Sequence, residues 1–323
     1  MNRLLQIITA ALVLSVHAST ALAQAYPDRP VRLVVGAPAG GAADTVARLV
    51  ADKFSRSLGQ PVVVENRPGA GGILAVKSVT SSKADGYTLL LFFADNLTIA
   101  PLLSKTAPYD SLKDLEYAGA VARSNSFLLV VHPKVPAQNF DEFVKLAKSA
   151  PKKVTFATYG LGSFPQLSYE MMSAQAQIEM LHVPYKGGVE SQQAVVGGSV
   201  DSVAGINIVE LVKGGKLRAL AVGGTKRSPN FPAIPTLAEL GYGDQIFGPV
   251  VYGVAAPAGT PKDIMEKLSI EARKVAEAPD SVDRLAAIVS EPYAASGEQI
   301  TVMVKKAIES YLPHIKRLGL ASQ

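Results

Sequence analysis

The stretch VVGAPAGGAADTVARLVADKF, residues 34–54, decides the fold of this chain. The apolar run 31–35 is short and rich in valine, as buried strands are, and a loop of glycine, alanine and proline follows it. Apolar residues then recur every four positions: Val46, Val50, Phe54 and Leu58. This spacing predicts a helix with one apolar face, which Gly59 ends. Residues 61–65 form the next strand, so the order strand, helix, strand indicates a parallel sheet covered by helices.

The same order returns in the second half of the chain. Residues 153–158 predict a strand, the loop TYGLGS (158–163) follows, and residues 164–175 have a helical pattern. Two such units predict two α/β lobes, and if each loop lies at the carboxyl end of its strand, both loops face a common cleft. Other apolar runs predict strands at 87–93, 127–131, 180–183, 200–205, 217–222 and 250–256. Amphipathic stretches predict helices at 140–149, 260–278 and 297–318.

The N-terminus has the order of a secretory signal peptide. Arg3 precedes an apolar run, and the small residues Ala21, Ala23 and Ala25 follow. The run is short for a membrane span, so we expect residues 1–23 to be a signal peptide, cleaved near Ala23 or Ala25, and the mature protein to reach the periplasm. The chain has no cysteine, which excludes disulfides, thiolate metal sites and a lipid anchor on cysteine.

Nucleic acids and nucleotides are poor partners for this sequence. Its 32 lysines and arginines against 27 acidic residues give a net charge of +5, and the basic residues are scattered rather than gathered in a run with aromatics. Gly36 and Gly41 have the spacing of a phosphate-binding loop, but Ala42 and Ala43 stand where it needs lysine and a hydroxyl. Pro165 occupies the third glycine position of a dinucleotide fingerprint. We therefore expect no nucleotide cofactor.

The two glycine loops suit a small anion. Small side chains let a ligand approach the backbone, and a helix N-terminus presents unpaired N–H groups with partial positive charge. A carboxylate is a natural partner for two such termini, one from each lobe. The alternative is that the glycines of these loops only turn the chain tightly: Gly40, Gly41, Gly160 and Gly162. The pattern by itself leaves both interpretations open.

Catalytic and metal-binding patterns are missing. The histidines of the mature chain are isolated and lack metal-ligand spacing: His132, His182 and His314. Ser163 does not lie in a G-x-S-x-G elbow, so capping or ligand hydrogen bonding suits it better than nucleophilic attack. Asp44 falls in the first turn of a helix, where the dipole favours it, and this structural interpretation is preferred over contact with a ligand. We predict no catalytic residue, no metal and no enzyme activity.

Several long segments together resemble one known family, the Bug-type substrate-binding proteins of tripartite tricarboxylate transporters. They are YPDRPVRLVVGAPAGGAADTVAR, LGQPVVVENRPGAGGILAVKSV, ADGYTLLL, APYDSLKDL, HVPYKGG, GKLRALAV, PTLAELGY and APAGTPKDIMEKL. The resemblance implies a two-lobed periplasmic binding protein of type II-like α/β fold, each lobe a mixed, mostly parallel sheet flanked by helices. It also implies a cleft between the lobes, with 26–123 and 252–323 in lobe I and 124–251 in lobe II.

The family captures a small organic carboxylate in the cleft and delivers it to membrane permease subunits, without a cofactor. By this resemblance the gripping loops are 39–44 and 158–163, and topology adds Asn96, Asn207 and Tyr159, with Tyr185 as either a cleft residue or a packed aromatic. The predicted ligand-binding residues are Ala39, Gly40, Gly41, Ala42, Ala43, Asp44, Asn96, Thr158, Tyr159, Gly160, Gly162, Ser163, Tyr185 and Asn207.

Three expectations remain open beside this interpretation. In ENRPGAGG, either Asn66 and Arg67 lie near the cleft or, as we favour, the segment is structural and Pro68, Gly69, Gly71 and Gly72 form a turn into the next helix. A ligand-sensing partner of a sensor protein needs the same lobes as a transport receptor, and a secreted hydrolase or lyase acting on carboxylates is a weaker alternative. Nothing in the sequence indicates an oligomer, so a monomer is expected.

Overall fold

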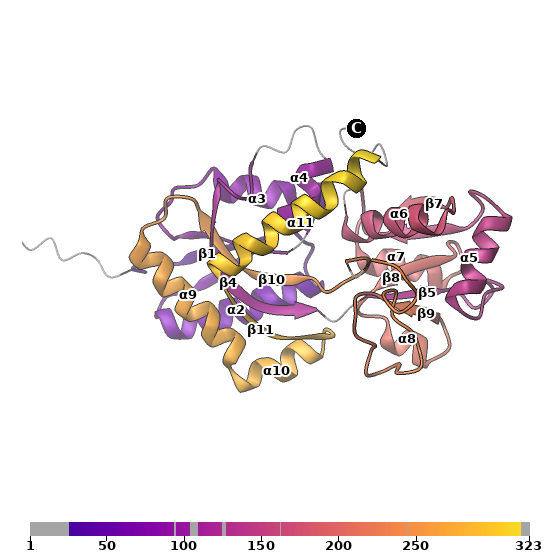
Figure 1. Ribbon diagram of the computed structural model, residues 1–323. Coiled ribbons are helices and arrows are strands. Elements are labelled where there is room, and N and C mark those ends of the chain that lie inside the picture. The colour runs from indigo at the N-terminus through magenta and orange to yellow at the C-terminus, as the bar shows by residue number, and fades with distance from the viewer. Residues whose placement is uncertain are drawn as a thin grey trace, which may run out of the picture.

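The computed structural model describes residues 26–93, 95–103, 109–124, 127–161, 163–243 and 245–317. The predicted signal peptide, residues 1–23, and the predicted ligand residue Gly162 lie outside the described residues. The described chain contains one sheet of six strands and one of five. In Figure 1 the elements of the two sheets form two bodies side by side, with α9 and α11 in one and α5 and α8 in the other.

The first sheet has the order β11-β4-β10-β3-β1-β2. Its strands are β1 (Val31–Val35), β2 (Val62–Asn66), β3 (Thr88–Phe92), β4 (Leu115–Ser124), β10 (Val251–Pro257) and β11 (Ser290–Ser296). β1 pairs in parallel with β2 and β3, whereas β10 is antiparallel to β3 and β4, and β11 is antiparallel to β4. The C-terminal part of the chain thus returns to the sheet that the N-terminal part begins.

Helices cover both faces of this sheet. They are α2 (Ala42–Leu58), α3 (Ile73–Thr80), α4 (Ala100–Leu103), α9 (Lys262–Glu277), α10 (Pro279–Ala286) and α11 (Gly297–Arg317), with short helical segments η1 (Ala70–Gly72) and η2 (Asp95–Ile99). Successive side chains of β1 point to opposite faces of the sheet. Leu33 therefore packs in a core shared with α2 and α9, and Val34 in a core shared with α3 and α11. The predicted apolar stripe of α2 is confirmed, because Val46, Val50 and Phe54 are fully buried.

The second sheet has the order β7-β6-β8-β5-β9. Its strands are β5 (Leu128–Val131), β6 (Thr155–Thr158), β7 (Leu181–Pro184), β8 (Ser202–Gly205) and β9 (Arg218–Val222), and its helices are α5 (Phe140–Ser149), α6 (Phe164–Ala176), α7 (Gly188–Val196) and α8 (Val209–Lys213). β6 pairs in parallel with β7 and β8, whereas β5 is antiparallel to β8 and β9. Residues of α5 and α6 pack on one face, and residues of α7 and α8 pack on the other.

Two segments that join the sheets lie side by side. The N–H of Ser124 donates to the carbonyl of Val250 at 2.8 Å, and the N–H of Val250 donates to Ser124 Oγ at 2.9 Å. Further on, the N–H of Phe127 donates to the carbonyl of Phe247 at 3.0 Å, and that of Gly223 to the carbonyl of Phe127 at 2.8 Å. The two passages between the sheets are therefore one hydrogen-bonded unit.

Two sequence-based expectations are wrong. The sheets are mixed, as predicted, but they are not mostly parallel, because the strands that enter and leave each sheet, β4, β10, β5 and β9, run antiparallel to their neighbours. The sequence prediction also lacked β4 and β11 as strands. The parallel pairs are those between β1, β2 and β3 and between β6, β7 and β8, which are the strands that carry the glycine loops.

Candidate functional site

The predicted site residues gather at one edge of each sheet. Because β1, β2 and β3 are parallel, the segments after them leave the same edge of the first sheet: 36–41, 67–72 and η2. Because β6, β7 and β8 are parallel, 159–163, 185–187 and 206–208 leave one edge of the second. Every predicted ligand residue that the structure describes lies at the end of one of these strands or in the loop or first helical turn that follows.

The two edges approach each other. A methyl group built on Gly187, in the loop after β7, would lie 4.0 Å from Cγ of Pro38, in the loop after β1. Helix α6, which begins at the second glycine loop, contacts the η2 segment after β3. The loops predicted to grip the ligand therefore stand on opposite sides of the junction between the two bodies.

Asp44 organises the first loop. Its side chain is buried; Oδ2 accepts the N–H of Gly40 at 2.9 Å and Nε of Arg48 at 2.8 Å, while Oδ1 accepts Nδ2 of Asn66 at 2.9 Å. Burial alone raises the pKa of this carboxyl, but the hydrogen bonds from Arg48, Gly40 and Asn66 together hold the pKa below its usual value. Asp44 is thus ionised and its oxygens are occupied by the protein, as the structural interpretation predicted.

Asn66 joins the ends of two neighbouring strands. Besides its bond to Asp44, Nδ2 donates to the carbonyl of Ala37 at 3.1 Å, and the N–H of Arg67 donates to the carbonyl of Val35 at 2.7 Å. The alternatives for ENRPGAGG are therefore not exclusive, because Asn66 is structural and also fixes the glycine loop. The sequence gives one indication of this contact: Asn66 ends one strand, Ala37 lies just beyond the end of the strand before it, and the two strands are parallel.

The N-terminus of α2 is open. Its N-cap is Gly41, which has no side chain to accept a backbone N–H, and the N–H groups of Ala42 and Ala43 in the first turn have no acceptor within the helix. Ala39 and Gly40, which precede it, are exposed. This end of the helix carries partial positive charge, and residues 36–44 contain no lysine or arginine. An anion bound here would therefore be held by backbone groups.

The second loop is held by its own hydroxyls. Thr158 Oγ1 accepts the N–H of Gly160 at 3.2 Å, and Ser163 Oγ donates to the carbonyl of Gly160 at 2.7 Å. Gly160 has φ +132°, a conformation that residues with a Cβ rarely adopt. Ser163 is the N-cap of α6, and its hydroxyl serves the loop rather than the helix N–H groups. Hydrogen bonds among its own residues therefore fix the described part of this loop.

His182 supports this loop from the neighbouring strand. Its Nε2 lies 2.7 Å from Oγ1 of Thr158, and its ring stacks on Phe156 with centroids 4.9 Å apart. Burial lowers the pKa of His182 to about 4, so the imidazole is neutral at neutral pH. The sequence predicted a packed or exposed histidine, and its contact with a ligand-loop residue was missed.

The other predicted residues have different surroundings. Asn96 is fully buried; its Oδ1 accepts the N–H of Phe93 at 3.1 Å, and its carbonyl accepts the hydroxyl of Tyr109 at 2.7 Å. Tyr185 packs against the core of the second sheet, and its N–H donates to the carbonyl of Thr158 at 2.9 Å. Tyr159 is half-buried and Asn207 is exposed. Asn96 and Tyr185 are thus bonded to neighbouring backbone groups, although Nδ2 of Asn96 is buried with no hydrogen-bond partner among the described residues, whereas Tyr159 and Asn207 keep surface at the edge.

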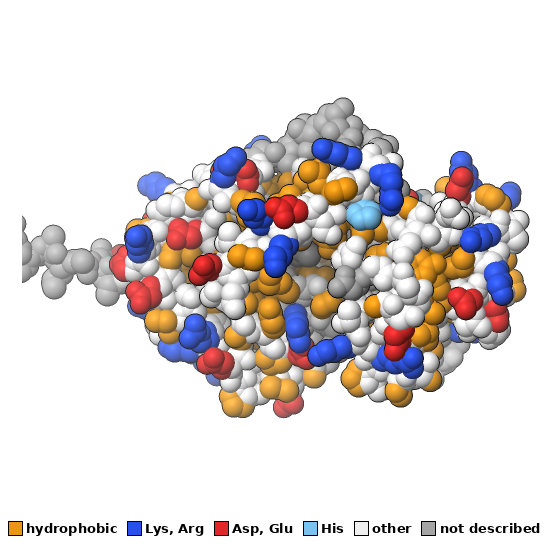
Figure 2. All heavy atoms as spheres, viewed as in Figure 1, with side chains coloured by type: hydrophobic (Ala, Val, Ile, Leu, Met, Phe, Trp, Pro, Cys, Tyr) orange, Lys and Arg blue, Asp and Glu red, His pale blue; other side chains and the backbone are white. Residues whose placement is uncertain are grey.

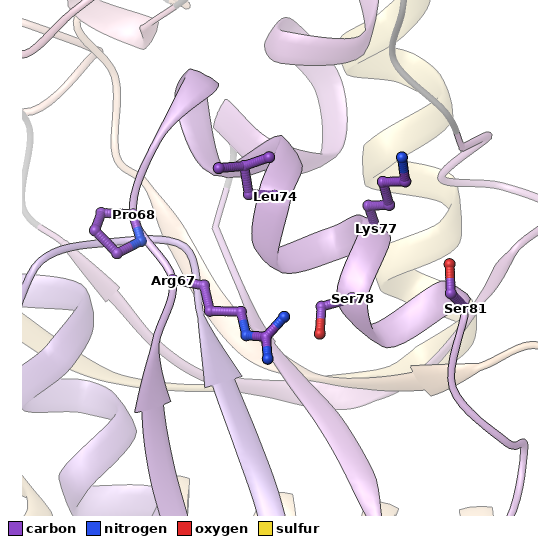
Figure 3. A pocket seen from close by; sticks show the side chains of 6 residues that line it. All are labelled: Arg67, Pro68, Leu74, Lys77, Ser78 and Ser81. Carbon is purple, nitrogen blue, oxygen red and sulfur yellow. The ribbon is translucent and has the colours of Figure 1, made fainter.

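Two surface grooves are also present, and the first shares Arg67 and Pro68 with the segment 67–72 at the edge of the first sheet. One, of about 540 Å³, runs beside α3 and is lined by Arg67, Pro68, Leu74, Lys77, Ser78 and Ser81 (Figure 3). In Figure 3 the guanidinium of Arg67 and the hydroxyl of Ser78 point toward one another. The other, of about 320 Å³, lies between α2 and α9. Neither contains a predicted ligand residue.

Neither charge on the face shown in Figure 2 nor metal chemistry among the described residues indicates a second site. Figure 2 shows blue basic side chains scattered among red acidic ones over the visible face, without a basic stripe. Within the part of the chain that the structure describes, no group of three or more histidine, aspartate or glutamate side chains is arranged to hold a metal ion. The glycine loops 36–41 and 159–163 contain no charged side chain and offer backbone and hydroxyl groups as their polar chemistry.

Comparison with known proteins gives one family. The sequence model described as "Tripartite tricarboxylate transporter family receptor" matches residues 46–320. Protein BugT of Bordetella pertussis is 33% identical over 99% of this chain and 98% of its own length. The structure of the periplasmic binding protein BugD is 31% identical, with a TM-score of 0.83 over 92% of this chain and 100% of BugD. An R. palustris protein solved with adipate is 29% identical, with a TM-score of 0.83 and coverage of 92% and 100%.

These matches confirm the resemblance found in the sequence. They span nearly the whole length of both partners, and they agree with the two mixed sheets and flanking helices. The family consists of substrate-binding receptors rather than enzymes. The chain belongs to the receptors of tripartite tricarboxylate transporters, of the Bug type, and has the two-lobed α/β fold of periplasmic binding proteins.

Proposed function

We propose that this protein is an extracytoplasmic receptor that binds a small organic carboxylate between its two lobes and delivers it to the membrane subunits of a tripartite transporter. One carboxylate oxygen meets the open N-terminus of α2 at residues 39–44, and the other meets the loop 158–163 of the second lobe. The carboxylate is held by backbone N–H groups and hydroxyls, and no catalytic residue or cofactor takes part.

The observation that carries this proposal is the opposition of the two loops. Each follows a parallel strand and precedes a helix, and the edges that bear them approach at Pro38 and Gly187. Asp44 and Asn66 fix the first loop, while Thr158 and Ser163 fix the second. Preformed loops bind an anion without a large ordering cost. The related R. palustris protein with adipate supports the ligand class.

Closure of the lobes is part of the proposal. We place lobe I at residues 26–123 and 252–323 and lobe II at 124–251. The two sheets support this division, although the terminal residues Ser124 of β4 and Val251 of β10 belong to the first sheet. The hydrogen-bonded passages at Ser124 and Val250 are the place where a hinge motion would occur.

Across the residues that the structure describes, no helix is long and apolar enough to span a membrane. We place the mature receptor in the periplasm as a monomer.

Thermal unfolding of the mature protein tests the ligand class. The protein is unfolded and refolded to remove any carried ligand, then heated with each of a panel of carboxylic acids and with the corresponding neutral amides. An acid at one hundred times its Kd is expected to stabilise the folded state by about 2.7 kcal/mol. Its amide, which lacks the charge that the helix N-termini favour, is expected to give no shift. Equal shifts with acid and amide, or shifts only with another chemical class, contradict the proposal.

A further inference from the structure

We propose that the groove beside α3 docks an acidic, partly apolar segment of a partner protein. The partner's identity rests on the proposed function, because for a transport receptor this partner is a membrane subunit. The groove lies in lobe I next to the ligand loop: Arg67 and Pro68, which line it, follow Asn66, whose side chain bonds Asp44. The shape, the charge and the apolar surface of the groove together favour this occupant.

The groove lies between a helix and the edge of a sheet. One wall is a stripe of α3 and its C-cap, and the other is the segment after β2; the lining residues are Arg67, Pro68, Leu74, Lys77, Ser78 and Ser81 (Figure 3). β2 is the last strand of the first sheet. The volume of about 540 Å³ is in the range of pockets that hold drug-sized molecules, so a single small anion would leave most of the groove unfilled.

The groove carries excess positive charge. Two arginines share one acidic partner: Nη2 of Arg32 lies 2.8 Å from Oε2 of Glu65, and Nε of Arg67 bonds Oε1. The hydrogen bonds from Arg67 and Arg32 hold the pKa of Glu65 below its usual value, so this carboxylate is ionised and offsets one arginine. Lys77, on the other wall, is exposed and forms no ion pair with a described residue. Three positive charges and one negative charge leave +2, which favours an acidic occupant.

Aliphatic side chains lie beside these charges. Leu74 is 52% exposed, and Val63 of β2 is 53% exposed. Val63 lies opposite Arg32 in the sheet, and both point to the face that α3 covers, because Val34, two residues from Arg32, packs in the core shared with α3. Covering this surface is favourable only for an occupant with carbon side chains, which an inorganic anion lacks. A concave surface with apolar and basic parts therefore suits a protein segment that carries both acidic and apolar residues.

A synthetic peptide tests the proposed occupant. The probe is a fluorescein-labelled peptide of alternating glutamate and leucine, and its binding to the mature protein is measured by fluorescence anisotropy. One comparison peptide has glutamine in place of every glutamate, and another has serine in place of every leucine. We expect the parent peptide to bind roughly tenfold or more tightly than either. Equal binding of a comparison peptide, or no binding of the parent peptide, overturns the inference.

Lys77→Glu tests whether the peptide occupies this groove. The substitution reverses one charge on the wall of the groove and keeps a good helix former, so we expect the Kd of the peptide to rise roughly tenfold or more while the fold is kept. Lys216→Glu is the matched control, because it makes the same change in net charge at an exposed position between α8 and β9 in the other lobe. Equal losses in the two variants mean that the peptide responds only to net charge, which contradicts the assigned groove.

Other anionic occupants give different results. Vesicles of phosphatidylcholine with phosphatidylglycerol, and inorganic phosphate, are tested with the same variants. Binding of either that Lys77→Glu abolishes, without binding of the peptide, overturns the inference in favour of a membrane surface or a small anion.

Calorimetric titration with the best acid of the panel separates this inference from the proposed function. We expect the same Kd for the acid before and after Lys77→Glu, because Lys77 lies outside the two glycine loops. A changed Kd would place Lys77 in the ligand site and contradict the inference. If no acid binds, the proposed function fails, and the peptide titrations still decide whether the groove binds an acidic segment.

Discussion

Replacing Asp44 by alanine is expected to lower the free energy of unfolding by about 3 kcal/mol and to weaken carboxylate binding at least tenfold. The substitution removes the acceptor of three hydrogen bonds, from Gly40, Arg48 and Asn66. Asn66 Nδ2 would keep only its bond to the carbonyl of Ala37, and the N–H of Gly40 would have no side-chain acceptor. The first loop would then lose the conformation in which its backbone faces the ligand. Urea unfolding and calorimetric titration with the best acid of the panel measure the two effects.

Asp52→Ala provides the comparison on the same helix. Asp52 also pairs with an arginine four residues later, Arg56, at 2.9 Å, and with Arg284 at 3.0 Å, but these ion pairs lie at the surface. Exposed ion pairs contribute little, so we expect a loss of less than about 1 kcal/mol and unchanged ligand affinity. If both aspartate variants behave alike, Asp44 does not organise the loop in the way described above.

Gly223→Ala is expected to destabilise the protein by about 3 kcal/mol or more, or to prevent folding. A Cβ at this buried position would lie 1.9 Å from the carbonyl oxygen of Phe247. That oxygen has little freedom to move, because it accepts the N–H of Phe127, and Phe247 is also held by the bond from its N–H to Ser168 Oγ at 3.1 Å. The clash falls where the chain passes between the lobes. Urea unfolding of the purified variant gives the loss.

Gly188→Ala is the matched substitution. Gly188 begins α7, its φ is not in the left-handed region, and a Cβ built there has open space around it. Alanine favours a helix over glycine by up to about 1 kcal/mol, so we expect unchanged or slightly increased stability. A similar loss in both variants would mean that the close contact at Gly223 is not the cause.

Local pattern was enough to predict the two strand–loop–helix units. In the first, the buried run before Gly36 and the four-residue spacing from Val46 each point to one element, and the structure places both as predicted. The same holds for the loop between β6 and α6. Strands of this kind have a local signal because they are buried on both faces and therefore apolar throughout.

Strands β4 and β11 lacked such a signal. β4, LEYAGAVARS, is rich in alanine and is made a strand by pairing with β10 and β11 on its two sides. β11 contains Pro292 and lies at the sheet edge, where a missing N–H is tolerated. In both cases tertiary pairing decides the conformation, and one sequence does not reveal the partner.

The side-chain contacts within the site could not be predicted from the sequence either. Asp44 and Asn66 are 22 residues apart, and Thr158 and His182 are 24 apart, yet each pair meets through side chains. The parallel order of the strands brings these positions to one edge, but it does not determine which atoms bond. The sequence could therefore predict the loops, and the structure was needed to show what holds them.

A crystal structure of the mature protein with the acid that gives the largest thermal shift tests the central claim most directly. We expect both carboxylate oxygens to lie within hydrogen-bond distance of backbone N–H groups, one set in residues 39–44 and the other in 158–163, with Asp44 still bound to Gly40, Arg48 and Asn66. A carboxylate bound instead by lysine or arginine side chains, or an acid seated outside the junction of the two lobes, would contradict the account.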